Sequence, residues 1–215
     1  MDLGITILDH AVFQRTQNNC SSHPFRGSCA VDGPVLMTVR SDNGILSAWK
    51  NVPVGFARQG QLQGNIEGLP AGGPYELTLA IENSREKVSF HDIYVGDVWI
   101  LAGQSNMAGF AFMPSMSTPH PAVKCFYMNN RWGVAEDPLH DVMRAAAPVH
   151  GGDPSLPRPK KFLRGPGPGL PFALAMYEKT QVPQGVIACA HGGTSMSQWD
   201  PDKKSQGDYS LYGAL

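Results

Sequence analysis

Ser105 is a candidate nucleophile because it follows an apolar run that stops at a glycine. The run and its turn are Val95-Gly96-Asp97-Val98-Trp99-Ile100-Leu101-Ala102-Gly103-Gln104-Ser105-Asn106-Met107. Short, β-branched and aromatic, the run predicts a buried strand. A serine just past such a strand lies at the carboxyl edge of a sheet, where reactive groups of open α/β folds gather. Backbone N–H groups of the turn could hold an oxyanion there. The pattern equally fits an ordinary loop in which Ser105 is a helix N-cap.

Three more segments of distinct character lie downstream. They are Ala135-Glu136-Asp137-Pro138-Leu139-His140, Gly165-Pro166-Gly167-Pro168-Gly169-Leu170-Pro171-Phe172-Ala173 and Gly185-Val186-Ile187-Ala188-Cys189-Ala190-His191-Gly192-Gly193-Thr194-Ser195-Met196-Ser197-Gln198-Trp199. Together with the Ser105 segment, and in this order, they resemble the SGNH hydrolase superfamily, in the version found in sialate O-acetylesterases and plant-type acetylxylan esterases. The resemblance runs from about residue 93 to the end of the chain. It implies a flavodoxin-like, three-layer α/β fold.

The resemblance also implies a serine esterase that removes acetyl groups from carbohydrate. Ser105 would be the nucleophile, and backbone N–H groups of Ser105 and of Gly192 or Gly193 would hold the oxyanion. Gln104 and Asn106 would keep the geometry of the loop. Candidate substrate contacts, including aromatic residues that could stack on a sugar ring, are His191, Thr194, Trp199, His140, Trp132 and Phe110. Buried packing is the commoner fate of such aromatics. The sugar itself, whether sialic acid, xylan or another acetylated glycan, stays open.

The catalytic base is the missing part of this pattern. In the superfamily the histidine comes from an Asp-x-x-His block near the end of the domain, and no such block follows Trp199. Asp137 and His140 have that spacing but precede the second glycine block, so we expect a structural or substrate-facing loop there. His191 is an improbable base, and the other histidines are expected to be solvated: His10, His23, His91, His120 and His150. We therefore expect the front part of a hydrolase, without its base and without a metal site.

Composition excludes several classes of function. Lys and Arg total 17 against 18 Asp and Glu, the net charge is −1, and no basic run occurs. A nucleic-acid or anionic-membrane partner therefore has no electrostatic basis. No apolar stretch approaches the ~18 residues that span a bilayer, and no signal peptide is visible. Because members of the superfamily are often exported, the compartment stays open, as does the oligomeric state; no cofactor is expected.

The four cysteines show no metal-ligand spacing. Cys20 and Cys29 could bridge a surface loop in an oxidising compartment, although ordinary loop thiols are the favoured interpretation. Cys189 lies within an apolar run and is expected to be buried.

The hydropathy pattern changes between residues 92 and 93 and divides the chain there into two parts. Residues 1–92 contain short alternating runs typical of an all-β, sandwich-like module or small barrel, and residues 93–215 resemble the N-terminal part of the esterase domain. Predicted strands are Ile5–Leu8, Val12–Arg15, Val35–Arg40, Gly55–Arg58, Gln61–Ile66, Tyr75–Ile81, Val88–His91, Val95–Leu101, Val123–Tyr127 and Val186–Ala190. A helix is predicted over Leu170–Lys179, after a long surface loop at Pro148–Pro168. A flavodoxin-like strand order would leave Val186–Ala190 at an unpaired sheet edge, which favours aggregation.

Two other functions remain to be weighed against esterase activity. The chain could be a non-catalytic carbohydrate-binding or structural fragment. A phosphate-binding role fails on spacing, because neither Gly103-Gln104-Ser105 nor Gly192-Gly193-Thr194 is followed by a P-loop lysine.

Overall fold

The computed structural model describes residues 5–110, 117–157 and 165–215. The chain is a sheet-dominated α/β fold with two compact units. Unit 1 consists of Met1–Val98 with Gln181–Gly185, and unit 2 of Trp99–Thr180 with Val186–Leu215. The predicted limit between residues 92 and 93 falls inside a long strand that runs from one unit into the other. The assignment of separate domains stays a prediction.

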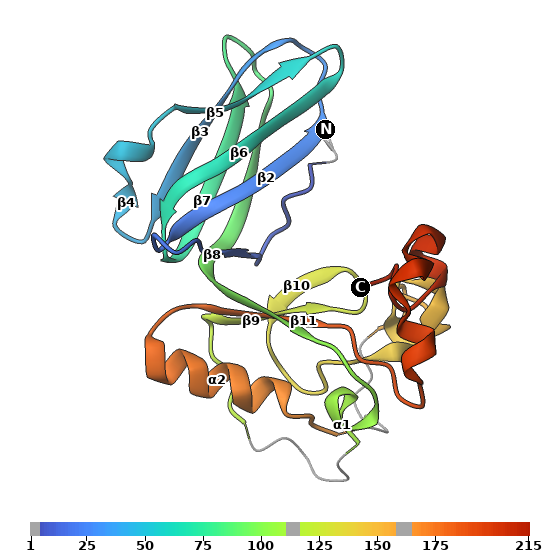
Figure 1. The fold of residues 1–215 in the computed structure, drawn as a ribbon. Coiled ribbons are helices and arrows are strands. Elements are labelled where there is room, and N and C mark those ends of the chain that lie inside the picture. Colours follow the sequence, from blue (N-terminus) through green and yellow to red (C-terminus); the bar gives the residue numbers. More distant parts are fainter. Residues whose placement is uncertain (1–4, 111–116, 158–164) are drawn as a thin grey trace. The chain divides into compact units, whose positions relative to one another are not determined.

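Unit 1 is an antiparallel sheet that closes on itself (Figure 1). Its strands run in the order β8-β7-β3-β5-β6-β2, β1 pairs in parallel with β8, and a bridge between Arg15 and Ser21 joins β1 to β2. The bounds are β1 Val12–Gln14, β2 Cys20–Ser28, β3 Gly33–Ser41, β4 Gly44–Ile45, β5 Val52–Arg58, β6 Gln61–Pro70, β7 Gly72–Ile81 and β8 Lys87–Leu101, with a 3₁₀ turn η1 at Ser47–Trp49.

Alternation of side chains builds the interior of unit 1. In β3, Val35, Met37 and Val39 are buried while the residues between them are not. β7 does the same with Tyr75 and its alternate neighbours. Because successive side chains of a strand point to opposite faces, this period of two buries one face of each strand. The predicted strands in these two regions are confirmed.

In the first hundred residues one predicted strand is wrong, two predicted strands are parts of a single longer one, and one strand was missed. Ile5–Leu8 is not a strand, although Ile7 is buried. Val88–His91 and Val95–Leu101 belong to one strand, β8, which continues through a bulge at Asp92, where φ is +57°. β2 was not predicted because its sequence is polar and contains a proline. It owes its conformation to antiparallel pairing with β6.

Cys20 and Cys29 lie at opposite ends of β2, and both thiols are free. A strand rises ~3.3 Å per residue, which separates the two by roughly 30 Å. A disulfide needs Cα atoms about 4.4–6.8 Å apart. The bridge that their sequence spacing allowed is therefore excluded, and they are ordinary thiols.

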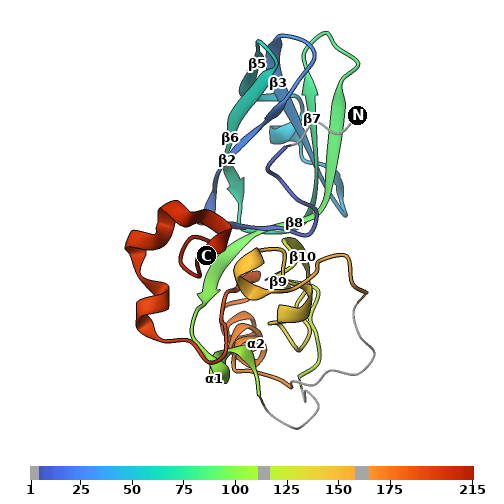
Figure 2. The same cartoon turned by 90° about the vertical axis from the view of Figure 1, so that its right-hand side faces the viewer.

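Unit 2 contains the end of β8 and the elements that follow it. They are α1 Ser105–Ala108, β9 Val123–Tyr127, β10 Arg131–Val134, α2 Gly169–Thr180 and β11 Gln184–Ala188, with 3₁₀ turns η2 Val142–Arg144, η3 Pro148–His150, η4 Met196–Trp199 and η5 Pro201–Tyr209. In both views α1 follows the end of β8, and α2 lies on one side of the strands (Figures 1 and 2). The predicted helix is confirmed, while β10 was missed. η3 occupies part of the predicted loop Pro148–Pro168, and residues 158–164 of that loop lie outside the described residues.

The strand order in unit 2 differs from the predicted one. It is β10-β9-β11-β8, so β11 lies between β9 and β8 and is not an edge strand. Beyond the strand ends, Cys189 and His191 donate backbone hydrogen bonds to the carbonyls of Leu101 and Gly103. Steps of two residues in the same direction on both strands are the pattern of a parallel pair. The predicted aggregation hazard at Val186–Ala190 therefore has no structural basis.

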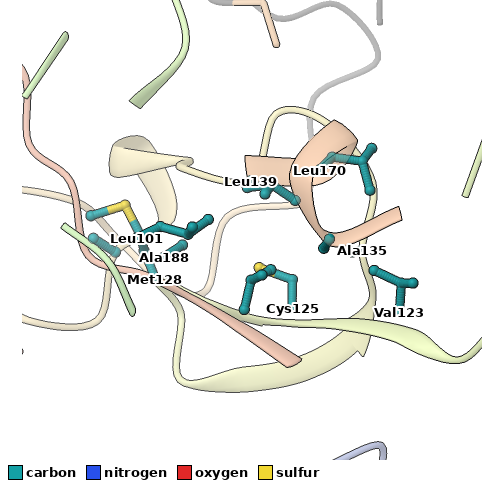
Figure 3. Close-up of a cluster of buried hydrophobic side chains, with 11 residues drawn as sticks. Leu101, Val123, Cys125, Met128, Ala135, Leu139, Leu170 and Ala188 are labelled. Carbon is teal, nitrogen blue, oxygen red and sulfur yellow. The ribbon is translucent and has the colours of Figure 1, made fainter. Parts of the chain in front are cut away.

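A single apolar cluster holds unit 2 together (Figure 3). Leu170 and Ala173 of α2 are 0% exposed and pack on side chains of β9 and β11, among them Val123 and Val186. The end of β8 joins the same cluster through Leu101, two residues before Gly103. The core thus anchors the strand that leads into the Ser105 turn.

Among the described residues, no helix is long and apolar enough to cross a membrane.

Candidate active site

Ser105 is the first residue of α1 and follows a turn that only glycine fits. Gly103 has φ +145°, and a Cβ at this position would lie 3.2 Å from the Cβ of Met107. Met107 is itself packed on the apolar cluster, so the turn cannot open to make room. Ser105 is partly exposed, while Gln104 and Asn106 on either side are exposed. Within the described residues, neither the hydroxyl nor the backbone N–H of Ser105 donates a hydrogen bond.

The glycine loop after β11 lies beside Ser105. A Cβ built on Gly192 would lie 3.9 Å from the Cα of Ser105 and 3.1 Å from the ring of Phe110. Gly192 and Ser105 are 87 positions apart in the sequence. The parallel course of β8 and β11 brings them together, because the carboxyl ends of parallel strands meet at one edge of a sheet. Gly193 has φ +78°, a conformation that glycine adopts readily.

Hydrogen bonds through His191 and Thr194 fasten this loop. The backbone N–H of His191 donates to the carbonyl of Gly103 at 3.0 Å. The Thr194 hydroxyl donates to the carbonyl of His191 at 2.8 Å and accepts from the indole Nε1 of Trp199 at 3.0 Å. Ser195 then starts η4 with a capping box closed by Gln198. These contacts tie Thr194 and Trp199 to the loop that contains Gly192 and Gly193.

The segment of alternating glycine and proline packs against the turn that follows α1. Gly109 has φ +87°, and a Cβ there would run into the backbone of Gly165 and Gly167. A Cβ on Gly169 would strike the side chains of Leu101 and Leu139. Backbone therefore lies directly on backbone at this point. The glycines of this segment therefore pack closely against the residues on both sides of the Ser105 turn.

The side chain of His140 is buried and is not exposed at the candidate site. It is 2% exposed, and its Nε2 donates to the carbonyl of Leu101 at 3.3 Å. Burial lowers the pKa of His140 from 6.5 to about 4; the hydrogen bond to Leu101 opposes the shift, and the charge of His150 adds to it. Leu139 and Ala135 of the same segment belong to the apolar cluster. Of the two interpretations of this segment, structural or facing the substrate, burial of His140 fits the structural one.

His150 was expected to be solvated, and this is wrong. It ends η3, is partly buried, and its Nδ1 lies 2.7 Å from Nδ1 of His191. Burial is the main cause that lowers the pKa of His150 from 6.5 to about 4, and the charge of His191 contributes to this shift. No local sequence signal marks this pair, since the two histidines are 41 residues apart. His23 is not simply solvated either, because its ring stacks on Phe13 in unit 1.

A cavity of about 620 Å³ opens beside the Ser105 turn. Its lining is largely apolar and consists of Ala102, Gly103, Gln104, Thr194, Ser195, Met196, Trp199, Tyr212 and Leu215. Of the aromatics singled out in the sequence, Trp199 lines the cavity and Phe110 covers Gly192. Trp132 instead packs against Phe126, with ring centroids 5.5 Å apart. A cavity of this size fits a ligand of one or two rings.

The site places a serine hydroxyl beside the backbone of the glycine loop after β11. No cluster of three or more potential metal ligands occurs in the described part of the chain. No histidine of that part forms a hydrogen bond with the Ser105 hydroxyl. The arrangement can present a nucleophile to a carbonyl carbon beside backbone N–H groups, which is the geometry of acyl transfer.

Comparison with known proteins identifies the family. A sequence model described as carbohydrate esterase, sialic acid-specific acetylesterase, matches residues 95–215. The chain belongs to this family. The match begins close to residue 93, where the resemblance in the sequence begins, and contains all four segments that carry it. Acetyl ester hydrolysis by a carbohydrate esterase is thus the activity of the family.

Individual relatives of this esterase family are distant. Sialate O-acetylesterase of rat is 24% identical over 143 residues, covering 62% of this chain and 26% of the rat protein. The human sialate O-acetylesterase is 27% identical over 150 residues, with 62% and 27% covered. A probable carbohydrate esterase of Arabidopsis thaliana is 26% identical over 121 residues, with 48% and 41% covered. The chain spans about a quarter of the length of the two sialate O-acetylesterases.

The fold has a counterpart among solved structures. A carbohydrate acetylesterase from Xanthomonas citri superimposes with a TM-score of 0.58 at 20% identity, covering 95% of this chain and 43% of the other. At this identity the likeness concerns the fold alone.

Proposed function

We propose that this member of the esterase family carries the nucleophile and the oxyanion donors of a serine acetylesterase acting on O-acetylated carbohydrate. The observation that carries the proposal is the proximity of Gly192 to Ser105, 3.9 Å from a built Cβ to Cα. Membership of the family supports the ester chemistry. Sialic acid is the sugar that the family description names, and other acetylated glycans remain alternatives.

The reaction begins with attack of Ser105 Oγ on the acetyl carbonyl carbon. The carbonyl oxygen becomes an oxyanion, held by the backbone N–H of Ser105 and that of Gly192 or Gly193. Collapse of the tetrahedral intermediate breaks the ester bond and releases the sugar hydroxyl, leaving acetyl-Ser105. Where a base is present to activate it, water then hydrolyses this second ester to acetate and restores the hydroxyl. Gln104 and Asn106 flank the nucleophile and keep its loop in place.

Acetyl transfer from a sugar ester also requires a base for the Ser105 proton, and we propose no residue of this chain for it. With 4-nitrophenyl acetate the leaving group departs as an anion, so solvent can accept that proton and acetyl-Ser105 can form. His140 is buried against Leu101, and the facing nitrogens of His150 and His191 are engaged with each other. The proposal is thus confined to the nucleophile and the oxyanion donors. It predicts that acetyl-Ser105 persists once formed, because its hydrolysis needs a base as well.

The sugar would occupy the cavity of about 620 Å³ next to Gly103 and Gln104. Trp199 offers an aromatic face there, and its indole orientation is held by Thr194. Gln104 supplies a polar side chain to the lining of the same cavity. An aromatic wall with few polar groups is a suitable surface for the apolar face of a sugar ring.

Acetylation by 4-nitrophenyl acetate tests the proposal directly. The chain, Ser105→Ala and Ser89→Ala are incubated with the ester, and their peptides are analysed by mass spectrometry. Ser89 is an exposed serine of unit 1 that pairs with Thr78, so it serves as a matched control. We expect acetyl groups on the Ser105 peptide of the chain and of Ser89→Ala, and none at this position in Ser105→Ala. An unmodified Ser105 would favour a non-catalytic, carbohydrate-binding or structural role.

A further inference from the structure

The contact between His150 and His191 restricts the protonation of both rings. Their Nδ1 atoms lie 2.7 Å apart, and the rings are nearly parallel, at 20°. Two nitrogens approach this closely only when one carries a proton and the other a lone pair. One ring therefore donates through Nδ1–H and the other accepts. With this hydrogen bond in place, at most one of the two rings can be a positively charged imidazolium. A second added proton would set two N–H groups against each other.

His191 connects this pair to the Ser105 turn. Its backbone N–H is bonded to Gly103, and its carbonyl accepts from Thr194. The next residue, Gly192, is the one that faces Ser105. The ring of His191 is thus a third anchor for the loop, and His150 contacts this ring through Nδ1. His150 itself is held in η3, where its backbone N–H donates to Ala147 at 3.1 Å.

The surroundings of His150 favour its neutral form. A small cavity of about 40 Å³ against His150 is lined mainly by apolar residues and by no acidic side chain of the described chain. Titratable side chains near His150 are those of His191 and Cys189 after β11, of His140 after β10 and of Tyr127 in β9. Burial lowers the pKa of His150, and the charge of His191 acts in the same direction. The hydrogen bond between His150 and His191 is therefore present at neutral pH and is lost in acid, when both rings are protonated.

We propose that His150 is a positioning residue for the oxyanion loop, holding Gly192 beside Ser105 through its hydrogen bond to His191, and doing so only while the two rings share at most one extra proton. This role rests on the proposed esterase function. His150 does not itself touch the reacting atoms. The chemistry it governs is the placement of a backbone N–H, to which acyl transfer is sensitive: deletion of one oxyanion donor costs about 10²–10³-fold in kcat. Displacing the donor is expected to cost about ten-fold.

Two variants separate this role from simple packing. His150→Phe keeps a ring of similar size but removes the hydrogen bond to His191. His150→Gln keeps an amide that can donate to His191 and cannot be protonated. His91→Gln is the control, because His91 is an exposed histidine of unit 1. The readouts are ring and backbone NMR of the full chain, together with the rate of Ser105 acetylation by 4-nitrophenyl acetate as a function of ester concentration and pH.

In the unaltered chain we expect one of the two rings to be an Nδ1–H tautomer at pH 7. His150→Phe is expected to shift the amide resonances of Ser105 and Gly192. It should lower the maximal acetylation rate about ten-fold while the half-saturating ester concentration stays nearly constant. In the unaltered chain the acetylation rate should fall in acid, as protonation breaks the contact between the two rings. His150→Gln should keep the rate at pH 7 and should not show this fall. The proposal is overturned if both rings are Nε2–H tautomers, or if these amides do not move in His150→Phe. If the unaltered chain is not acetylated at Ser105, the proposed function fails, and the NMR results alone still decide the positioning role.

Discussion

Replacing His140 by glutamine should remove much of the acid sensitivity of unit 2. The ring of His140 is 2% exposed, and the side-chain amide of glutamine can reach the Leu101 carbonyl in place of Nε2–H. Burial is the main cause that lowers the pKa of His140 from 6.5 to about 4 in the folded chain. An unfolded chain regains the ordinary value. Between pH 6.5 and pH 4 the unfolded state therefore binds more protons, and acid destabilises the fold.

The two pKa values of His140, 6.5 unfolded and about 4 folded, give the magnitude. The linked loss of unfolding free energy is roughly 2 kcal/mol between pH 7 and pH 5, rising to about 3.4 kcal/mol below pH 4. This contribution is present in full above pH 6.5 and is lost as the pH falls through 4. The lowered pKa of His150 acts in the same window. Only the difference between the unaltered chain and His140→Gln isolates His140.

Urea unfolding at pH 7, 6 and 5 measures this difference. Tryptophan fluorescence reports mainly on unit 2, which contains Trp99, Trp132 and Trp199, whereas unit 1 contains Trp49. We expect the unaltered chain to lose about 2 kcal/mol more than His140→Gln between pH 7 and pH 5. His91→Gln should follow the unaltered chain. Equal pH dependence in all three proteins would refute the reasoning, because it would mean that His140 takes up its proton without unfolding.

Two further substitutions test the core and the glycine loop. Leu170→Ala should lower the free energy of unfolding by about 2–5 kcal/mol, measured in urea, because Leu170 is 0% exposed within the apolar cluster; a loss below about 1 kcal/mol would contradict this packing. Gly192→Ala adds a methyl group 3.1 Å from the exposed ring of Phe110 and 3.9 Å from Ser105 Cα. It should slow Ser105 acetylation about ten-fold or more with little change in the urea midpoint, and an unchanged rate would argue against Gly192 as a neighbour of the reacting group.

The regular strands and the positions of the two key turns were predictable from local sequence. Alternating apolar residues mark β3 and β7, and short apolar runs before glycine mark the end of β8 and the course of β11. β2 and β10 lack such patterns, because backbone pairing with β6 and β9 determines them. The two strands predicted on either side of Asp92 form one strand, because backbone pairing with β7 continues on both sides of the bulge. The left-handed conformation of Asp92 is accommodated by contacts from outside the strand, including an ion pair with His10.

The sequence by itself determined which residue types could take part in ester chemistry and that each follows a strand. Ser105 and Gly192 both come after apolar runs, and neighbouring parallel strands bring such ends together. Only the tertiary structure decided that order, with β11 between β9 and β8, and the fate of each histidine. A histidine in a sequence shows neither its burial nor its partner. His140 is enclosed by residues of the core, and His150 meets His191 from 41 residues away, because burial and long-range contact arise only when the whole chain packs.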